Sequence, residues 1–312
     1  MINFMRRVPA GTFLIPMVVS MVIYSFWPSL FKIGGPTEAF FSSTGTNYII
    51  GLLVFASGTT VDLHKIGKLL KHQGALVVFK IVLSIIYSFV FLYFFGLEGI
   101  WGISGLGFVA VIMSINPAIN LSITDTYGEK DDAAIYPFAV IPSLPAIPLI
   151  IMSVYISGGL GEVDWTPVIS VFFPLIVGII FGNVDKEMGK IFGAAMPASL
   201  ILLGWLLGQN MNMFEAIKSG VSGVIVTVIF MALTMPLMDF FETKILHYEG
   251  YSGIALSTVA GVTTAVPAIV AVALPQVSEY VVSATAQILT ATIITNVFAP
   301  IIVRKLYGKR HH

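Results

Sequence analysis

Two short polar stretches interrupt otherwise apolar sequence, and each contains a proline. The first is Met113-Ser114-Ile115-Asn116-Pro117-Ala118, and the second is Thr263-Thr264-Ala265-Val266-Pro267-Ala268. Proline lacks an amide hydrogen and clashes with the preceding turn, so each stretch predicts a broken helix with unpaired main-chain groups. The half-helices that begin near Pro117 and Pro267 would direct their positive ends at the break, which suits an anionic group such as a carboxylate.

The simpler alternative is that both prolines only kink continuous helices, while Ser114 and Thr264 bond carbonyls of their own preceding turns. The spacing of the two stretches favours broken helices instead. Val109-Ala110 and Pro117-Ala118-Ile119 recur 150 positions later as Val259-Ala260 and Pro267-Ala268-Ile269. Paired interruptions in corresponding spans are typical of transporter binding sites.

Other polar residues extend this predicted site. Lys80 lies about six residues, or roughly 9 Å of helix rise, inside a predicted span. It either reaches back to the membrane surface or pairs structurally, or it has a functional role in binding the substrate carboxylate or holding the broken-helix region. Gln209 ends another span, where helix capping is the alternative role. Gln287, Thr290, Thr295 and Asn296 are expected to form hydrogen bonds between helices. The predicted site residues are Lys80, Ser114, Asn116, Pro117, Ala118, Asn120, Ser143, Gln209, Thr263, Thr264 and Pro267.

The elements that must position these residues are membrane-spanning helices. Of the 312 residues, 57% are apolar and 10% are charged, whereas a soluble domain carries about a quarter charged residues. Since a span needs about 20 apolar residues, the sequence predicts an all-α polytopic membrane protein with ten transmembrane helices. Apolar runs place the spans at 9–28, 45–61, 74–95, 100–126, 133–157, 166–183, 191–210, 219–241, 251–274 and 278–303.

The repeated motifs predict that the ten helices form two five-helix units. An odd number of spans per unit gives the second unit the opposite orientation, so residues 1–160 and 161–312 are expected to be inverted repeats, with discontinuous crossing helices 4 and 9.

Basic residues are distributed unevenly over the predicted connections. With the amino terminus inside, 13 of the 16 lysines and arginines fall on the cytoplasmic side, which predicts that both termini are cytoplasmic. Lys32 and Lys218 fall outside, and Lys80 lies within a span.

The sequence also argues against several classes of function. It has no cysteine and a net charge of zero, which excludes thiolate metal sites and gives no reason to expect a nucleic acid partner. No nucleotide-binding or metalloprotease motif is present, and we expect no cofactor or metal. Without a nucleophile and base pair, a membrane-embedded enzyme or receptor is the weaker alternative to a secondary transporter of a small organic anion.

The sequence resembles the 2-keto-3-deoxygluconate permease family along nearly its whole length. The matching residues include Pro9-Ala10-Gly11, Gly74 to Lys80, Asn116, Tyr127 to Ala133, Gly182 to Asp185, and Gly253 to Ser257. The resemblance implies proton-coupled uptake of a sugar acid across the bacterial inner membrane and a bile-acid-symporter-like fold. It further implies elevator movement of a core domain (spans 3–5 and 8–10) against a panel domain (spans 1, 2, 6 and 7).

Two positions depart from this family pattern. Where family members carry acidic residues before the Asn116 match and before a Ser-x-Pro sequence, this chain has Met113 and Pro142. Embedded carboxylates are groups readily tuned to bind protons near neutral pH. Their replacement leaves proton and sodium as alternative coupling ions, the latter in a sodium-coupled organic-anion symporter.

Overall fold

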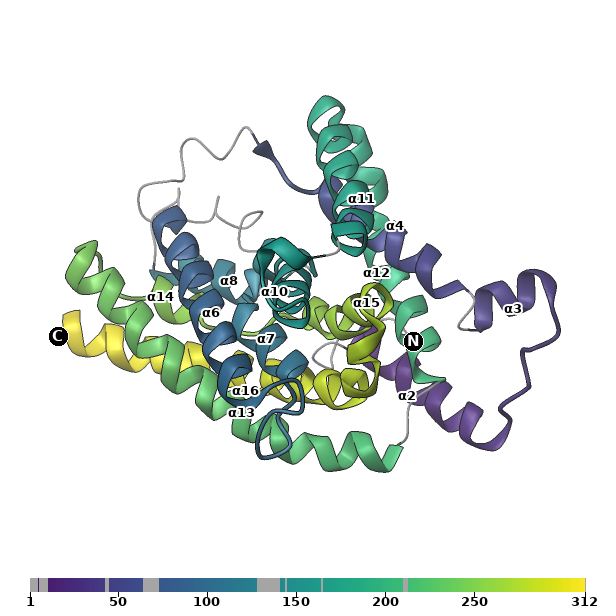
Figure 1. Ribbon diagram of the computed structural model, residues 1–312. Helices are drawn as coiled ribbons and strands as arrows, with labels where there is room; N and C mark the ends of the chain where they lie inside the picture. Colours follow the sequence, from purple (N-terminus) through teal and green to yellow (C-terminus); the bar gives the residue numbers. More distant parts are fainter. Residues whose placement is uncertain are drawn as a thin grey trace.

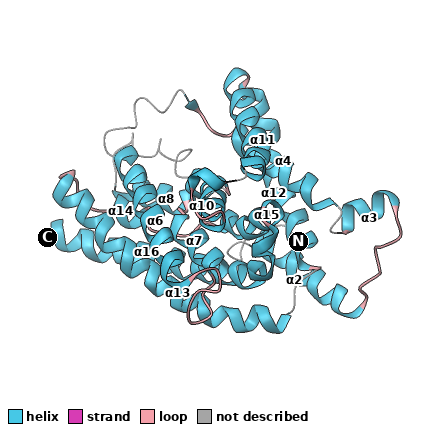
Figure 2. Ribbon diagram, in the orientation of Figure 1, coloured by secondary structure: helices cyan, strands magenta, loops and turns pink. Residues whose placement is uncertain are grey.

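The computed structural model describes residues 5, 11–42, 45–63, 73–127, 141–143, 145–163, 165–209 and 213–311. Helices form nearly all of this described part (Figure 2), and its only pairing of extended type is an isolated bridge between Ile100 and Ile103. The helices that match the first four predicted spans are α2 (Gly11–Phe26), α4 (Thr46–Thr59), α6 (Gln73–Phe95) and the pair α7 (Gly105–Met113) and α8 (Pro117–Tyr127). The short helix α3 (Gly35–Phe41) precedes α4.

The remaining predicted spans also contain helices. They are α10 (Ala146–Ile156), α11 (Trp165–Val184), α12 (Lys186–Gly208), α13 (Met213–Phe240) and α16 (Val281–His311), and the ninth consists of α14 (Ser252–Ala255) and α15 (Val266–Ala273). Short helical turns η4 (Ile141–Ser143), η5 (Leu160–Glu162), η6 (Phe241–Ile245), η7 (Gly261–Ala265) and η8 (Pro275–Tyr280) link them.

Several described segments are suited to crossing a bilayer. Four are long and apolar enough on their own, namely Gln73–Phe95, Lys186–Leu206, Gly220–Ile245 and Pro275–Tyr307. The α3 and α4 helices are bent by 57° at their junction and would together make a fifth. The chain is therefore a multi-pass helical membrane protein, while the full number of ten crossings stays a prediction.

The helices pack in two groups (Figure 1). One group consists of α2, α4, α11 and α12, in which α2 packs on α12 and α11 packs on α4. The other is built around α6, α7, α13 and α16 and includes the short helices α8, α10, α14 and α15. Contacts of α11 with α10 and α15 join the groups.

Glycines allow very close helix packing in the first group. A Cβ atom on Gly58 of α4 would collide with the carbonyl oxygen of Leu175 in α11. Likewise, a Cβ atom on Gly208 of α12 would collide with the carbonyl oxygen of Met17 in α2. Both helix pairs therefore depend on a glycine where one backbone meets the other.

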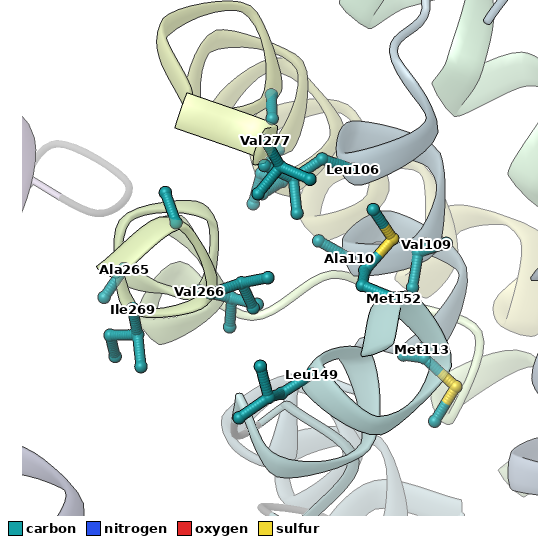
Figure 3. Packing of buried hydrophobic residues seen from close by; sticks show 14 of the residues in the cluster. Leu106, Val109, Ala110, Met113, Leu149, Met152, Ala265, Val266, Ile269 and Val277 are labelled. Carbon is teal, nitrogen blue, oxygen red and sulfur yellow. The ribbon is translucent and has the colours of Figure 1, made fainter. Parts of the chain in front are cut away.

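The main hydrophobic core includes residues of both groups of helices. All nine residues of α7 are buried, and Figure 3 shows Val109, Ala110 and Met113 of this helix near Leu149 and Met152 of α10, with α15 opposite. The α6 helix covers this core with a polar inner face of Gln73, Lys80, Ser84 and Ser88 and an apolar outer face of Val78, Val82, Ile86 and Val90. A helix whose polar side chains face the protein and whose apolar side chains face outward is suited to contact with lipid on its outer side.

Candidate functional site

The break predicted at Pro117 is confirmed. The α7 helix ends at Met113, the residues Ser114 to Asn116 lie outside any helix, and α8 begins at Pro117. The Asn116 side chain caps the new helix, since its Oδ1 accepts a hydrogen bond of 3.3 Å from the amide of Ile119. Asparagine is a favoured residue for this role. One of the unpaired amides expected to face a ligand is thus already satisfied by the protein.

The second break is longer than the sequence predicted. The α14 helix ends at Ala255, a 3-10 turn spans Gly261–Ala265, and α15 begins at Val266 with Pro267 in its first turn. Proline fits a first turn because the missing amide has no partner there. In the described part of the chain, no side chain caps α15.

The two broken segments meet inside the protein. The hydroxyl of Ser114 lies 2.7 Å from that of Thr263, and it also accepts a hydrogen bond of 2.9 Å from the amide of Ala260. The amide of Asn116 donates to the Thr258 hydroxyl at 3.3 Å, and its side-chain Nδ2 donates to the carbonyl of Val259. Some of the main-chain groups freed by each break are therefore paired with side chains of the other segment.

Hydroxyl and amide groups from two further elements complete this crossing. The Ser143 hydroxyl of η4 donates to the Ile115 carbonyl at 2.6 Å and accepts from the Ile115 amide at 3.0 Å. From α16, the Thr295 hydroxyl accepts from the amide of Val259 at 3.0 Å, and Asn296 Oδ1 accepts from Asn116. We call Ser114, Asn116, Ser143, Thr258, Thr263, Thr295 and Asn296 the crossing cluster; apart from Asn296, these side chains are buried.

The other predicted residues have different positions. Thr264 bonds the carbonyl of Gly261 within its own turn, and Gln209 donates to the carbonyl of Phe41, away from the crossing cluster. Asn120 is fully buried one turn into α8, and neither atom of its amide group has a partner in the described part of the chain. The side chain of Ala118 lies outside the described part.

Lys80 does not reach the membrane surface. Its side chain is 0% exposed, and its Nζ donates to the carbonyl of Ile112 at 2.7 Å and to the Ser84 hydroxyl at 3.3 Å. The ammonium also lies 4.6 Å from the centre of the Phe230 ring. Lys80 is therefore attached to the end of α7, two residues before Ser114.

Some residues of this region had no clear signal in the sequence. Thr258 contributes to the crossing cluster, but its counterpart 150 positions earlier is Phe108, so the repeat did not indicate it. Glu242 is fully buried and accepts hydrogen bonds from the amides of Ser252, at 3.1 Å, and Gly253. Glutamate is mostly exposed in proteins, so its place in the sequence does not indicate this buried role. The hydrogen bonds expected from α16 to other segments are confirmed for Gln287, Thr295 and Asn296. The described hydrogen bond of Thr290 is to a residue of α16 itself.

A narrow pocket lies beside the crossing cluster, between the two groups of helices. Leu53, Val54, Ser57, Val171 and Leu175 line it from α4 and α11, and Ser143, Pro145, Ala146, Val262, Ala265, Val266 and Ile269 line it from the other group. Only about 10 Å³ of it is open to a water-sized molecule, which is far less than small-molecule sites usually offer, so a sugar acid could enter only if the two groups of helices moved apart. Ser143 belongs to both the pocket and the cluster, so a ligand in the pocket would adjoin the crossing.

Comparisons with known proteins agree on one family. The sequence profile described as 2-keto-3-deoxygluconate permease matches residues 2–312. Proteins named 2-keto-3-deoxygluconate permease from Xanthomonas euvesicatoria and Bacillus subtilis are each 28% identical to this chain. The alignments cover 98% of this chain and 96% of the Xanthomonas protein, and 95% of this chain and 90% of the Bacillus protein. A 2-keto-3-deoxygluconate permease 1 from Salmonella typhimurium is also 28% identical, over 95% of this chain and 92% of that protein.

Proposed function

The chain belongs to the 2-keto-3-deoxygluconate permease family, and from this premise we propose that it imports 2-keto-3-deoxygluconate or a related sugar acid across the bacterial inner membrane. It is a permease and not an enzyme. The observation that carries the proposal is the meeting of two broken helical segments through Ser114 and Thr263. Irregular backbone at membrane depth is tolerated where it lines a cavity or is buried in protein, and transporters bind their substrates at such places.

The substrate would bind beside the crossing cluster. Among the described residues no side chain caps the amino terminus of α15, and this terminus is suited to a carboxylate. The amide of Asn120 and the hydroxyls of Ser143, Ser114 and Thr263 are suited to the hydroxyl groups of a sugar acid. Pro117 and Pro267 would act by fixing where the two half-helices start.

We propose that the chain is a pair of inverted repeats. Under this proposal α2 corresponds to α11 and α4 corresponds to α12. The two glycine contacts support it, because Gly58 meets Leu175 as Gly208 meets Met17, and each of the latter two residues follows a proline inside its helix, Pro174 and Pro16.

Transport would follow an elevator-type movement. In this proposal α2, α4, α11 and α12 are the panel domain and the second group of helices is the core domain. The walls of the pocket between them are mostly apolar, so sliding there would break few hydrogen bonds. Movement of the core with bound substrate would then expose the crossing to each side in turn.

Flux measurements test the proposal directly. Purified protein in proteoliposomes should take up labelled 2-keto-3-deoxygluconate, and binding of this compound should raise the thermal stability of the protein. Uptake driven by a proton gradient supports proton symport. Met113 and Pro142 replace the expected acidic residues, so uptake is also measured with a sodium gradient in place of the proton gradient. Uptake driven only by sodium would make the protein a sodium-coupled symporter. Failure to move any sugar acid or monocarboxylate under either gradient would overturn the proposal.

A further inference from the structure

Lys80 is a fully buried titratable residue. It is the only lysine or arginine among the described side chains that is fully buried. No carboxylate in the described part of the chain forms an ion pair with it, since its hydrogen bonds go to Ile112 and Ser84. An ammonium group held inside a protein without an anion is unfavourable by several kcal/mol, of the order found for buried ions. Such a residue in a membrane span is a candidate for function.

The position of Lys80 follows from the break in the fourth predicted span. In a continuous helix the carbonyl of Ile112 would accept from the amide four residues later, that of Asn116. This amide donates to Thr258 instead, so the carbonyl accepts from Lys80 at 2.7 Å and from the Ser84 hydroxyl at 2.7 Å. The ammonium thus lies at the negative end of α7, where a positive charge is favoured.

The surroundings of Lys80 contain few other titratable groups. The α6 helix packs against α7, α10, α13 and α14, and neither α7 nor α14 carries a titratable side chain. Glu242, the one fully buried carboxylate among the described side chains, accepts from the amides of Ser252 and Gly253. The other titratable residues of these elements are Tyr87 and Tyr93 on α6, Tyr155 on α10 and Asp239 on α13, while the side chains of Glu215 and Lys218 on α13 lie outside the described part.

We propose that Lys80 is the residue that couples proton movement to substrate movement. This inference rests on the proposed function. When the substrate anion binds beside the crossing cluster, a proton from the outer solution binds the Nζ lone pair, and the ammonium and the carboxylate together carry no net charge. When the anion leaves on the inside, the ammonium releases the proton to the inner solution and returns to the neutral amine.

This cycle avoids moving an unpaired charge through the membrane. The loaded protein holds one ammonium and one carboxylate, and the empty protein holds a neutral amine, so both states that change orientation are neutral at the site. One proton accompanies each anion. Lys80 would thereby perform the task that carboxylates at the positions of Met113 and Pro142 would otherwise perform.

The first experiment separates exchange from accumulation in proteoliposomes that contain wild-type protein or Lys80→Met. Methionine is apolar and of similar length, and the Ser84 hydroxyl still satisfies the Ile112 carbonyl. Exchange of internal for external 2-keto-3-deoxygluconate needs no net proton movement, so it should persist in Lys80→Met with a raised half-saturation concentration. With a pH difference of one unit, wild type should accumulate substrate about tenfold and Lys80→Met should reach a ratio of about one. Lys186→Met, at an exposed position, should behave as wild type.

The second experiment measures protons directly and does not depend on the folding of a variant. Substrate binding to wild-type protein is followed by calorimetry in buffers of different ionisation enthalpy, and about one proton should be taken up for each anion bound. Lys80→Arg keeps a charge that is not lost at accessible pH, so it should take up none. Proton-driven accumulation by Lys80→Met or Lys80→Arg, or wild-type binding without proton uptake, would overturn the inference. Absence of any wild-type binding or exchange would instead overturn the proposed function.

Discussion

Asn116 has three roles at the crossing. Its amide bonds Thr258, its Nδ2 bonds Val259 and Asn296, and its Oδ1 caps α8. Among the contacts of the described residues, no other side chain of the cluster joins both broken segments and α16. A change that keeps the backbone but removes this side chain therefore acts on the geometry of the whole crossing.

We predict that Asn116→Ala lowers the rate of 2-keto-3-deoxygluconate uptake about 100-fold or more. The change leaves the hydrogen-bonding groups of Val259 and Asn296 without their partner and removes the cap of α8. The variant should still reach the membrane, since most of the core is unaffected. Uptake by membrane vesicles, normalised to the amount of protein in the membrane, gives the measurement. Thr290→Ala, which removes a hydroxyl that bonds only within α16 among the described contacts, is the control, and wild-type uptake by Asn116→Ala would remove this residue from the site.

Glu242 supports the amino-terminal end of α14. Both of its oxygens accept from main-chain amides, so in Glu242→Gln the NH₂ group would face one of these donors. We expect this variant to lose about 1–3 kcal/mol of stability, the range for an unsatisfied buried group. Thermal unfolding followed by fluorescence measures the loss. Glu187→Gln, at an exposed site on α12, should unfold like wild type, and an equal stability of Glu242→Gln would show that this cap is dispensable.

At the scale of elements, prolines gave the most reliable prediction. The starts of α8 and α15 follow from Pro117 and Pro267 because the effect of proline on a helix is local. The length of the second break could not be predicted in the same way. Residues 256–260 are apolar or small. They are not helical because groups far away in the sequence bond their main chain, such as the Thr295 hydroxyl, which accepts a hydrogen bond from the amide of Val259.

Close helix pairs in the first group give a prediction of their own. Gly58→Ala should destabilise the protein and reduce the amount that reaches the membrane, because the added methyl group collides with the rigid Leu175 carbonyl and not with a flexible side chain. Overpacking of this kind costs about 1–3 kcal/mol. Gly51→Ala lies in the same helix with nothing within 4 Å of the added atom and should be neutral or slightly stabilising. Thermal stability of the two variants decides the matter, and equal values would contradict close packing at Gly58.

At the scale of the whole molecule, the sequence predicted the class of protein because composition alone separates lipid-facing from water-facing chains. The position of Lys80 was less predictable. Its depth in the span was compatible with a surface contact, and only the packing of α7 and α13 around α6 places its ammonium at Ile112 and Phe230. Contacts between residues far apart in sequence therefore decide whether the Lys80 side chain reaches the membrane surface or stays inside the protein.

The orientation in the membrane can be tested because the chain has no cysteine. Lys32 is expected outside and Lys186 inside, and both side chains are exposed. In intact cells a membrane-impermeant maleimide should label Lys32→Cys and not Lys186→Cys, whereas both should react after lysis. Unmodified protein serves as the blank. The opposite pattern in intact cells would place both termini outside.

The contact between Lys80 and Phe230 has a consequence for how such a molecule can arise. These residues occupy matching positions 150 apart, so under the inverted-repeat proposal they face each other across the axis that relates the two halves. A dimer of two identical half-length subunits would bring together either two ammonium groups, which repel, or two aromatic rings, which carry no charge. Setting one cation against one ring requires halves that have become different. Joining both into a single polypeptide guarantees that every assembled molecule receives one of each.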